Sequence, residues 1–456
     1  MFWRDGHIMG RFFVGALVFV ALLPRARSDG PEALLVIAAD QHSAYERTAA
    51  VVATVDQLKA EHPGLPLAIL LDGDTLEYGN VVARRSQGLV DFAMLSELAK
   101  RGPTVVNLGN HETEFYDLVD TVKQIEATGA QVVTNITDRS TGRLAASPFV
   151  QLSLGLRKAV VVGVATDDVT TYRDAVRPLL GLTDPIAWAR ARFPGFLGKA
   201  PLKIILSHAG LKADRGMLPI VPDGTLFAGA HDHLRLVQFF GRTAYVHSGA
   251  WNTYLTLAWL QHDAAGAPRW DVEQRLISGD RADPKLSALI RETQVRYLTP
   301  TDREVVARIP AALAPYAAAR LVTSALRSGV RADASFVPNT TFGNGFSSPE
   351  VTRAAFDACV RFDGPIFVGT VDGARLRELL KVANQTVDTP FAQRTGEFNM
   401  AEAPATIEDA QSYRIVTTDW GAKNSSRYFG ASPILWHEQS GSTLKEVVLH
   451  AIEELK

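Results

Sequence analysis

Residues 33–42 read ALLVIAADQH, in which an uninterrupted apolar run over 33–39 is followed by Asp40 and His42. Residues 67–74, LAILLDGD, repeat the arrangement, with Asp72 and Asp74 after the apolar run. Short apolar runs bounded by polar residues are typical of buried strands. In open α/β sheets, ligands bind beyond the carboxyl ends of the strands. This stretch therefore predicts a buried sheet that carries a polar site at its strand ends.

Apolar strand runs alternate with helical periodicity on either side of this stretch. The alternation predicts an α/β fold (α+β in detail), in which a sheet core is flanked by helices. From residue 225 the pattern changes to strands joined by a tight turn at Gly241-Arg242. The expected strands are 33–39, 67–71, 104–108, 131–134, 159–164, 203–206, 236–240, 243–247 and 255–260, and the expected helices are 46–58, 89–98 and 115–125.

The chain also divides into blocks along its length. A polar stretch over Asp263–Pro268 is expected to close the first block. Residues 278–318 are mostly helical in pattern and charged, without strand runs, which indicates a connector. A second alternating block follows. We predict a catalytic domain over 29–275, a helical connector over 276–318 and a second domain over 319–456.

The composition excludes several classes of protein. The 456 residues include 47 Lys+Arg and 49 Asp+Glu, which gives a net charge of −2. Such a charge does not indicate a nucleic-acid-binding protein, which would carry an excess of basic residues. The proportions of apolar, charged, Gly and Pro residues are those of a globular protein rather than a disordered or fibrous one. A single cysteine excludes an intramolecular disulfide framework and a thiolate zinc site. Nothing in the sequence indicates an oligomeric state.

The first 28 residues have the pattern of a secretory signal. Arg4 and Arg11 are followed by the apolar run 12–23, FFVGALVFVALL, and then by Pro24 and the small-residue motif at 26–28. The alternative is an uncleaved anchor, but this run is shorter than the ~20 residues that a spanning helix needs. We therefore expect an exported protein, periplasmic or extracellular, with no membrane association after signal cleavage.

Polar motifs follow five of the expected strands, so five segments are expected to converge on one crevice. Imidazole, carboxylate and amide donors without a thiol suit divalent Mn, Zn, Fe or Co. One such motif alone is as compatible with a helix cap or a turn, but their conjunction suits two ions ~3.5–4 Å apart. The motifs are Asp40-Gln41-His42, Asp72-Gly73-Asp74, Gly109-Asn110-His111-Glu112, Ser207-His208 and His231-Asp232-His233.

These motifs, in this order, resemble those of the calcineurin-like metallophosphoesterases. The second block is similar to the C-terminal substrate domain of the secreted 5′-nucleotidase/UDP-sugar hydrolase branch, on the stretch Val371–Leu380, VDGARLRELL. The resemblance implies a metallophosphoesterase domain with a β-sandwich-type core, followed by an α+β 5′-nucleotidase-like domain. It covers nearly the whole chain after residue 28.

The resemblance also implies a role for each motif residue. A bridging hydroxide would attack the phosphate, and His111 would stabilise the transition state or protonate the leaving oxygen. Glu114 stands where the family has an Asp that pairs with this histidine. The implied metal ligands are Asp40, His42 and His233 for one divalent ion, Asn110, His208 and His231 for the other, and Asp74 as the bridge between them.

The second domain departs from the family pattern. Phe362 and Trp420 fall where the nucleotidases place two aromatic residues that stack on the base. However, Gly364 replaces a family Asn, and Ser426 replaces a family Asp. The stretch 339–344, NTTFGN, replaces a Gly-Gly segment whose arginine holds phosphate, and either Arg353 or Arg361 could take over that task.

The sequence therefore favours an exported two-metal phosphohydrolase that cleaves a small-molecule phosphate ester, in particular a nucleotide. One alternative is a 5′-nucleotidase-like hydrolase of a non-nucleotide ester, such as a sulfur-linked substrate carried by a protein. Another is a metal-holding binding module without turnover. The complete ligand set together with His111 argues against that last alternative, because binding alone needs no general acid.

Overall fold

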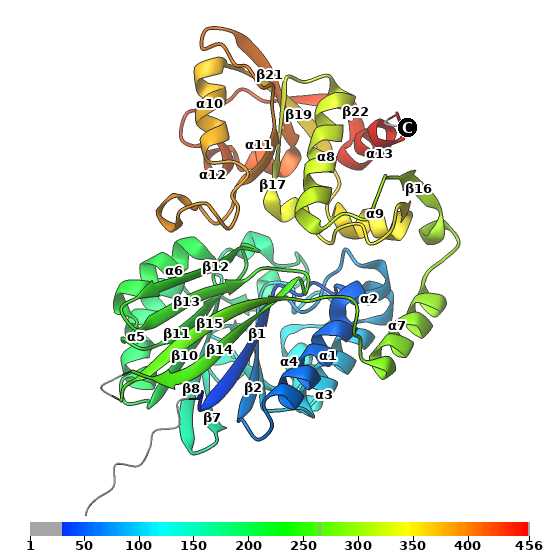
Figure 1. Cartoon of the computed structure of the whole chain (residues 1–456). Helices are drawn as coiled ribbons and strands as arrows, with labels where there is room; N and C mark the ends of the chain where they lie inside the picture. Colours follow the sequence, from blue (N-terminus) through cyan, green and yellow to red (C-terminus); the bar gives the residue numbers. More distant parts are fainter. Residues whose placement is uncertain (1–29, 264–265, 455–456) are drawn as a thin grey trace, which may run out of the picture.

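The computed structural model describes residues 30–263 and 266–454 (Figure 1). The expected signal, residues 1–28, lies outside the described residues. Within the described part, no helix combines the length and the apolar character that crossing a membrane requires. We refer to the β-rich part up to residue 276 as the first domain and to residues 315–454 as the second domain.

The first domain contains two six-stranded sheets. In the first sheet the order is β15-β14-β1-β2-β3-β4, with β1 to β4 parallel and β14 and β15 antiparallel to their neighbours. In the second sheet the order is β12-β13-β11-β10-β8-β7. The strands are β1 (Ala33–Ala39), β2 (Leu67–Asp72), β3 (Thr104–Asn107), β4 (Gln131–Val133), β7 (Phe149–Leu154), β8 (Arg157–Ala165), β10 (Leu202–His208), β11 (Leu226–Gly229), β12 (Arg235–Phe240), β13 (Thr243–Ser248), β14 (Tyr254–His262) and β15 (Pro268–Leu276).

The two sheets pack face to face, which explains why β1 is apolar at every position. Successive side chains of a strand point to opposite faces. Leu35 and Ile37 join the cluster between the sheets, whereas Leu34 and Val36 join the cluster under the helices. A strand covered on both faces requires a continuous apolar run rather than an alternating one.

Helices cover the outer faces of this sandwich (Figure 1). The predicted sheet core flanked by helices is therefore confirmed. The outer face of the first sheet packs against α1 (Tyr45–Glu61), α2 (Val81–Ser86), α3 (Leu89–Ala99), α4 (Leu118–Ala127) and α7 (Pro284–Tyr297). The outer face of the second sheet packs against α5 (Pro185–Leu197) and α6 (Leu211–Met217).

The second domain has a single mixed sheet with helices on both faces. The strand order is β20-β17-β21-β19-β22. Its strands are β17 (Ala334–Pro338), β19 (Pro365–Asp372), β20 (Asn399–Glu402), β21 (Ser412–Thr418) and β22 (His437–Thr443). One face packs against α8 (Pro315–Val330) and α13 (Leu444–Glu454), and the other packs against α10 (Gly373–Lys381) and α12 (Ser425–Phe429).

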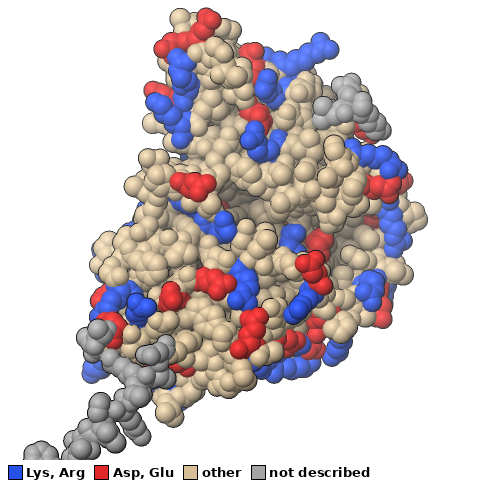
Figure 2. Space-filling view, viewed as in Figure 1, with Lys and Arg blue, Asp and Glu red and all other residues tan. Residues whose placement is uncertain are grey.

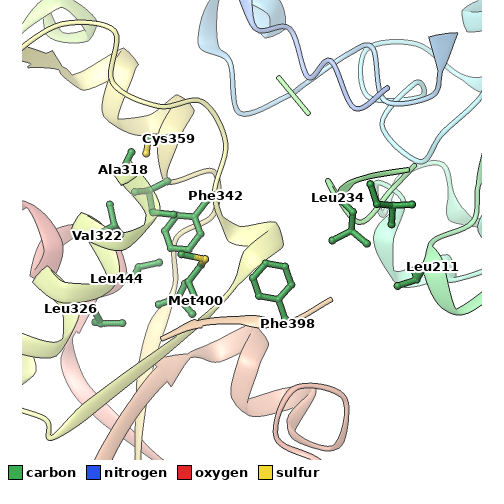
Figure 3. Close-up of a cluster of buried hydrophobic side chains, with 14 of the residues drawn as sticks. Leu211, Leu234, Ala318, Val322, Leu326, Phe342, Cys359, Phe398, Met400 and Leu444 are labelled. Carbon is green, nitrogen blue, oxygen red and sulfur yellow. The ribbon is translucent and has the colours of Figure 1, made fainter. Parts of the chain in front are cut away.

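One apolar cluster continues from the second sheet of the first domain into the second domain (Figure 3). Leu211 and Leu234 belong to the first domain, and Phe398 and Met400 belong to the second. Burial of such side chains contributes roughly 1.5–3 kcal/mol each. The two domains are thus in packed contact, and Figure 2 shows the surface hollowed where they meet.

Several elements differ from the sequence-based expectation, and three of the differences have a clear physical reason. The polar stretch expected to close the first block is followed by β15, an edge strand whose pattern is polar because Trp270 is its one buried side chain. The expected helix over 115–125 begins only at Leu118, because the Asp117 side chain caps its first turn. The connector contains a strand, β16 (Val305–Arg308), which pairs with β18 (Glu350–Thr352).

Candidate metal centre

The strand register places the polar motifs at one level. Ala39 of β1 pairs with Asp72 of β2, which in turn pairs with Asn107 of β3. In the second sheet, Ser207 of β10 pairs with Gly229 of β11. The loops that leave these strands therefore start side by side, as the sequence-based argument expects.

Asp72 and Asn107 join the two sheets directly beneath these loops. The Asn107 amide donates to Asp72 Oδ1 (2.8 Å) and to two carbonyls of the second sheet, those of Val164 and Leu206 (2.8 and 3.1 Å). The backbone N–H of Ser207 donates to Asp72 Oδ2 (3.0 Å). Burial raises the pKa of Asp72 to about 8. This carboxyl therefore has a structural role, and it fixes the distance between the loops of the two sheets.

The first group of candidate ligand atoms comes from Asp40, His42 and His233. Each residue offers one ligand atom, and these three atoms lie within 4.8 Å of one another. His42 Nε2 faces His233 Nε2 at 2.9 Å. Two ring nitrogens at this distance either share one proton or face a common cation. Burial and the charge of Arg361 lower the pKa of His42 to about 4, so its imidazole is in the neutral form that binds metal.

The second group comes from Asp74, His208 and His231, which also lie within 4.8 Å of one another. His208 Nδ1–H donates to the Asp72 carbonyl (2.8 Å), which leaves Nε2 as the nitrogen that faces the ligand group. That Nε2 is buried, has no hydrogen-bond partner and lies 3.1 Å from Asp74 Oδ2. His231 Nδ1 lies 2.9 Å from Asn110 Oδ1, so Asn110 adds an amide oxygen to this group.

Asp74 lies between the two groups. Its Oδ2 is 3.1 Å from His208 Nε2 and 3.9 Å from His42 Nε2. The donors are carboxylate, imidazole and amide atoms; five of the seven residues are buried, and His231 and His233 are half-buried. Among the described residues, His208 Nε2 has no regular hydrogen bond. Such a donor set suits two borderline divalent ions that share one carboxylate. The seven expected ligands are thus brought together, and they fit the group that the sequence predicts.

The backbone at this centre is strained. Among the described non-glycine residues, eleven have a positive φ, and five of them are expected ligands. A non-glycine residue in this region costs of order 1–3 kcal/mol and persists only where surrounding contacts enforce it. The five ligands are Asp40, His42, Asp74, His231 and His233, with φ between 47° and 80°.

Glu112 organises the Asp74 loop and was not singled out by the sequence analysis. Its buried carboxylate accepts hydrogen bonds from the backbone N–H groups of Asp74 (2.9 Å), Thr75 (2.6 Å) and Gly109 (2.6 Å). The available signal was an acidic side chain three residues after a glycine, a spacing that allows a local bond to the backbone. Two of its three bonds are long-range, however, and no local pattern indicates them.

His111 and Glu114 form the pair that the resemblance implies. His111 Nδ1–H donates to Glu114 Oε1 (2.6 Å), and the His111 backbone N–H donates to Asp74 Oδ1 (2.8 Å). Burial lowers the pKa of His111, but the charges of Glu114, Asp74 and Glu77 outweigh burial and raise it to about 9. A protonated imidazole next to the two ligand groups could donate a proton or stabilise negative charge.

Arg361 brings a positive charge from the second domain into the same centre. Its Nη2 lies 3.1 Å from His111 Nε2, and its guanidinium forms an ion pair with Glu77. Of the two arginines considered from the sequence, Arg361 is the one that reaches the centre. Arg353 instead begins α9 (Arg353–Cys359), where its backbone N–H donates to the Glu304 carbonyl (2.9 Å). Glu77 is a further residue of this centre, and no sequence pattern indicates it.

The two expected base-stacking residues have different surroundings. Phe362 is 52% exposed and follows Arg361, whose guanidinium lies 5.2 Å from the centre of its ring. Trp420 is half-buried, and its Nε1–H donates to Tyr428 Oη (3.2 Å). No ring contact joins Phe362 to Trp420 among the described residues. A role for both in stacking stays a prediction.

The fold is that of known two-domain hydrolases. A 5′-nucleotidase precursor from Thermus thermophilus superposes with a TM-score of 0.60 at 17% identity, over 93% of this chain and 96% of that one. The sulfate thiohydrolase SoxB from the same species superposes with a TM-score of 0.62 at 14% identity, over 93% of this chain and 94% of that one. A 5′-nucleotidase from Candida albicans superposes with a TM-score of 0.59 at 12% identity, over 93% of this chain and 98% of that one.

No protein-family model and no curated protein matches the sequence. The structural similarity nevertheless extends over both domains. The predicted resemblance to the metallophosphoesterase and 5′-nucleotidase proteins is therefore confirmed at the level of the fold.

The packing at Gly109 gives a test of the centre that does not depend on activity. A Cβ at Gly109 would overlap Asp74 Oδ1 and lie 2.7 Å from the Asp74 backbone nitrogen. We expect Gly109→Ala to weaken Mn²⁺ binding at least ~10-fold, the size of effect seen when ligand-orienting groups are changed. Thermal unfolding with and without Mn²⁺ would measure it, since a ligand at 100 times its Kd stabilises by about 2.7 kcal/mol.

Gly195 in α5 is the matched control, because a Cβ there would meet no atom within 4 Å. Gly195→Ala should keep the full stabilisation by Mn²⁺. Equal stabilisation of both variants would show that Asp74 does not contribute to metal binding.

Proposed function

We propose that this protein is an exported two-metal phosphohydrolase that cleaves small-molecule phosphate esters, with nucleotides as the leading substrate class. The observation that carries the proposal is the position of the Asp74 carboxylate between two groups of buried and half-buried imidazole and carboxylate donors. Export rests on the signal pattern of residues 1–28.

Asp40, His42 and His233 would hold one divalent ion, and Asn110, His208 and His231 would hold the other, with Asp74 shared. When bound, two such ions supply a strong nucleophile at neutral pH and neutralise the charge of a phosphate. Mn, Zn, Fe and Co all suit this donor set. The positive φ at five of these positions keeps the donors aimed inward.

His111 and Arg361 indicate where the substrate would bind. His111 Nε2 is the nitrogen that faces the centre, because Nδ1 is paired with Glu114. Arg361 Nη2 lies 3.1 Å from that nitrogen. A phosphoryl group next to His111 would therefore also meet the guanidinium, which pairs with phosphate oxygens in bidentate geometry. We assign Arg361 the phosphate-holding task.

The part of the substrate beyond the phosphate would contact the second domain. Phe362 is exposed next to Arg361 and is free to stack on a planar base. Gly364 offers no side chain to read the base, and a Cβ there would lie 3.1 Å from Asp419 Oδ1. We therefore expect little discrimination between purines and pyrimidines.

A second candidate is a thiohydrolase that acts on a sulfur-linked, protein-carried substrate. Two observations favour keeping it: the replacement of the expected Asn and Asp by Gly364 and Ser426, and the similarity of the fold to the sulfate thiohydrolase SoxB. Both candidates use the same metal centre, so only the substrate distinguishes them.

The proposal is tested by phosphate release from a panel of nucleotides, sugar phosphates and p-nitrophenyl phosphate. We expect Mn²⁺-dependent release that a chelator abolishes and added Mn²⁺ restores, because all the ligands come from side chains that release the metal reversibly. Sulfate release from a thiol-linked sulfonate without phosphate release would favour the thiohydrolase. Metal binding without any turnover would support a binding module instead.

His111→Ala should keep both metal ions but lower kcat by roughly 10²–10⁴-fold, the contribution of a positioned acid or base. The loss should be smaller for p-nitrophenyl phosphate, whose leaving group needs no proton. Comparison of kcat for the two substrates, with metal content from elemental analysis, measures both effects. An equal loss for both substrates would contradict proton donation by His111.

Phe362→Ala should raise KM for nucleotides about tenfold, because base stacking contributes ~1–3 kcal/mol. Phe362 is exposed, so its removal should not unfold the domain, unlike removal of the half-buried Trp420. Hydrolysis of p-nitrophenyl phosphate by the same variant is the internal control and should not change. An unchanged nucleotide KM would remove Phe362 from the substrate site.

A further inference from the structure

Glu77 is a buried carboxylate at the boundary between the metal centre and the second domain. It lies three residues after Asp74 and is 5% exposed. Its Oε1 accepts a hydrogen bond from the Gly79 backbone N–H (2.7 Å), which fixes the carboxylate plane. Its Oε2 lies 3.2 Å from His42 Nδ1 and 3.9 Å from His111 Nδ1, and it also forms the ion pair with Arg361.

The two nitrogens of His42 point to different partners. Nε2 faces His233 and Asp74 within the first ligand group. Nδ1 is buried and has no regular hydrogen bond, and Glu77 Oε2 is the carboxylate oxygen within ion-pair distance of it. Metal-binding histidines generally donate their second N–H to a carboxylate, which fixes the ring orientation and raises the basicity of the coordinating nitrogen.

Glu77 also belongs to a third group of donor atoms, with His42 and His111. A third metal ion is not needed to explain this group, because the guanidinium of Arg361 already supplies the positive charge. The cavity between His42, Glu77 and Arg361 has a volume of about 10 Å³, which is room for about one water molecule. The geometry therefore favours an orienting role over metal binding.

Arg361 ties this carboxylate to the second domain. Its side chain is 3% exposed and comes from the segment after α9. One oxygen atom, Glu77 Oε2, is thus shared between a ligand histidine of the first domain and an arginine of the second. A charged pair as buried as this one is costly to break from one side, since the remaining charge would be left unpaired.

From this shared contact we infer that Glu77 is a positioning residue, which orients His42 for the Asp40–His42–His233 metal subsite while it holds Arg361 in the centre. The inference rests on the proposed two-metal function, and it adds that one metal subsite depends on a carboxylate outside the ligand set. Glu77→Gln should weaken that subsite, and the subsite around His208 and His231 should be unaffected.

The test is a Mn²⁺ titration of the full chain by calorimetry, which measures two binding steps without reference to activity. We expect Glu77→Gln to weaken one step by ~10–100-fold, the usual effect of removing an outer carboxylate. The weakened step should be the one that His42→Ala abolishes. Arg361→Gln should not weaken either step, because removal of a nearby positive charge favours cation binding.

The double variant Glu77→Gln/Arg361→Gln keeps the test valid if Glu77→Gln leaves Arg361 unpaired and unfolds the chain. It removes both buried charges, and it should show the same selective loss. Asp168→Asn is the matched control, because Asp168 forms an ion pair across the same domain boundary with Arg427 (3.0 Å) but contacts no expected ligand. This control should bind Mn²⁺ as the unaltered chain does.

The inference is overturned if the Mn²⁺ affinities of both binding steps, in both Glu77 variants, stay within ~3-fold of those of the unaltered chain. The effect of removing an orienting carboxylate is about 10-fold or more. An equal loss at both steps, or a loss with Arg361→Gln alone, would also overturn it. If the unaltered chain takes up no Mn²⁺, the proposed metal centre itself is wrong. That outcome is distinct from metal uptake that is insensitive to Glu77.

Discussion

The carboxylate of Asp74 is buried among groups from three other loops, and the rest of the centre is arranged around it. Its Oδ1 accepts the His111 backbone N–H, and its Oδ2 faces His208. Its own backbone N–H is held by Glu112. A buried carboxylate without a compensating charge would be strongly unfavourable. The neighbouring imidazoles and the metal ions that they would hold provide this compensation.

This constraint explains why the surrounding backbone is unusual. The ligands must point inward from loops that leave parallel strands at the same level, and a positive φ at Asp40, His42 and Asp74 turns these side chains toward one another. Gly73 and Gly109 leave room where the chains approach most closely, since a Cβ at Gly73 would overlap the His208 ring at Nδ1. The Asp72–Asn107 junction beneath the loops holds the two sheets together and limits how far these loops could separate.

The second domain contributes directly to the centre rather than only covering it. Arg361 contacts both His111 and Glu77, and the apolar cluster around Phe398 packs the two domains together. A similar overall fold is shared by nucleotidases and by a sulfate thiohydrolase. The fold alone therefore does not decide between such substrates.

The sequence by itself determined most strands of the first domain, several of the helices that alternate with them and the donor residues at the strand ends. These are local properties: an apolar run such as 33–39 specifies a strand that is buried on both faces, and a motif such as His231-Asp232-His233 lies beside its own strand. The edge strand β15 escaped this reasoning because only one of its side chains, Trp270, is buried, so its sequence has no apolar run. A strand within the connector, β16, escaped because its partner β18 lies more than forty residues away. Only the tertiary structure decided that Arg361 rather than Arg353 enters the centre, and that Glu77 lies between His42 and this arginine. Arg361 and His111 are 250 positions apart in the chain, and no periodicity or spacing encodes a contact that the packing of two domains creates.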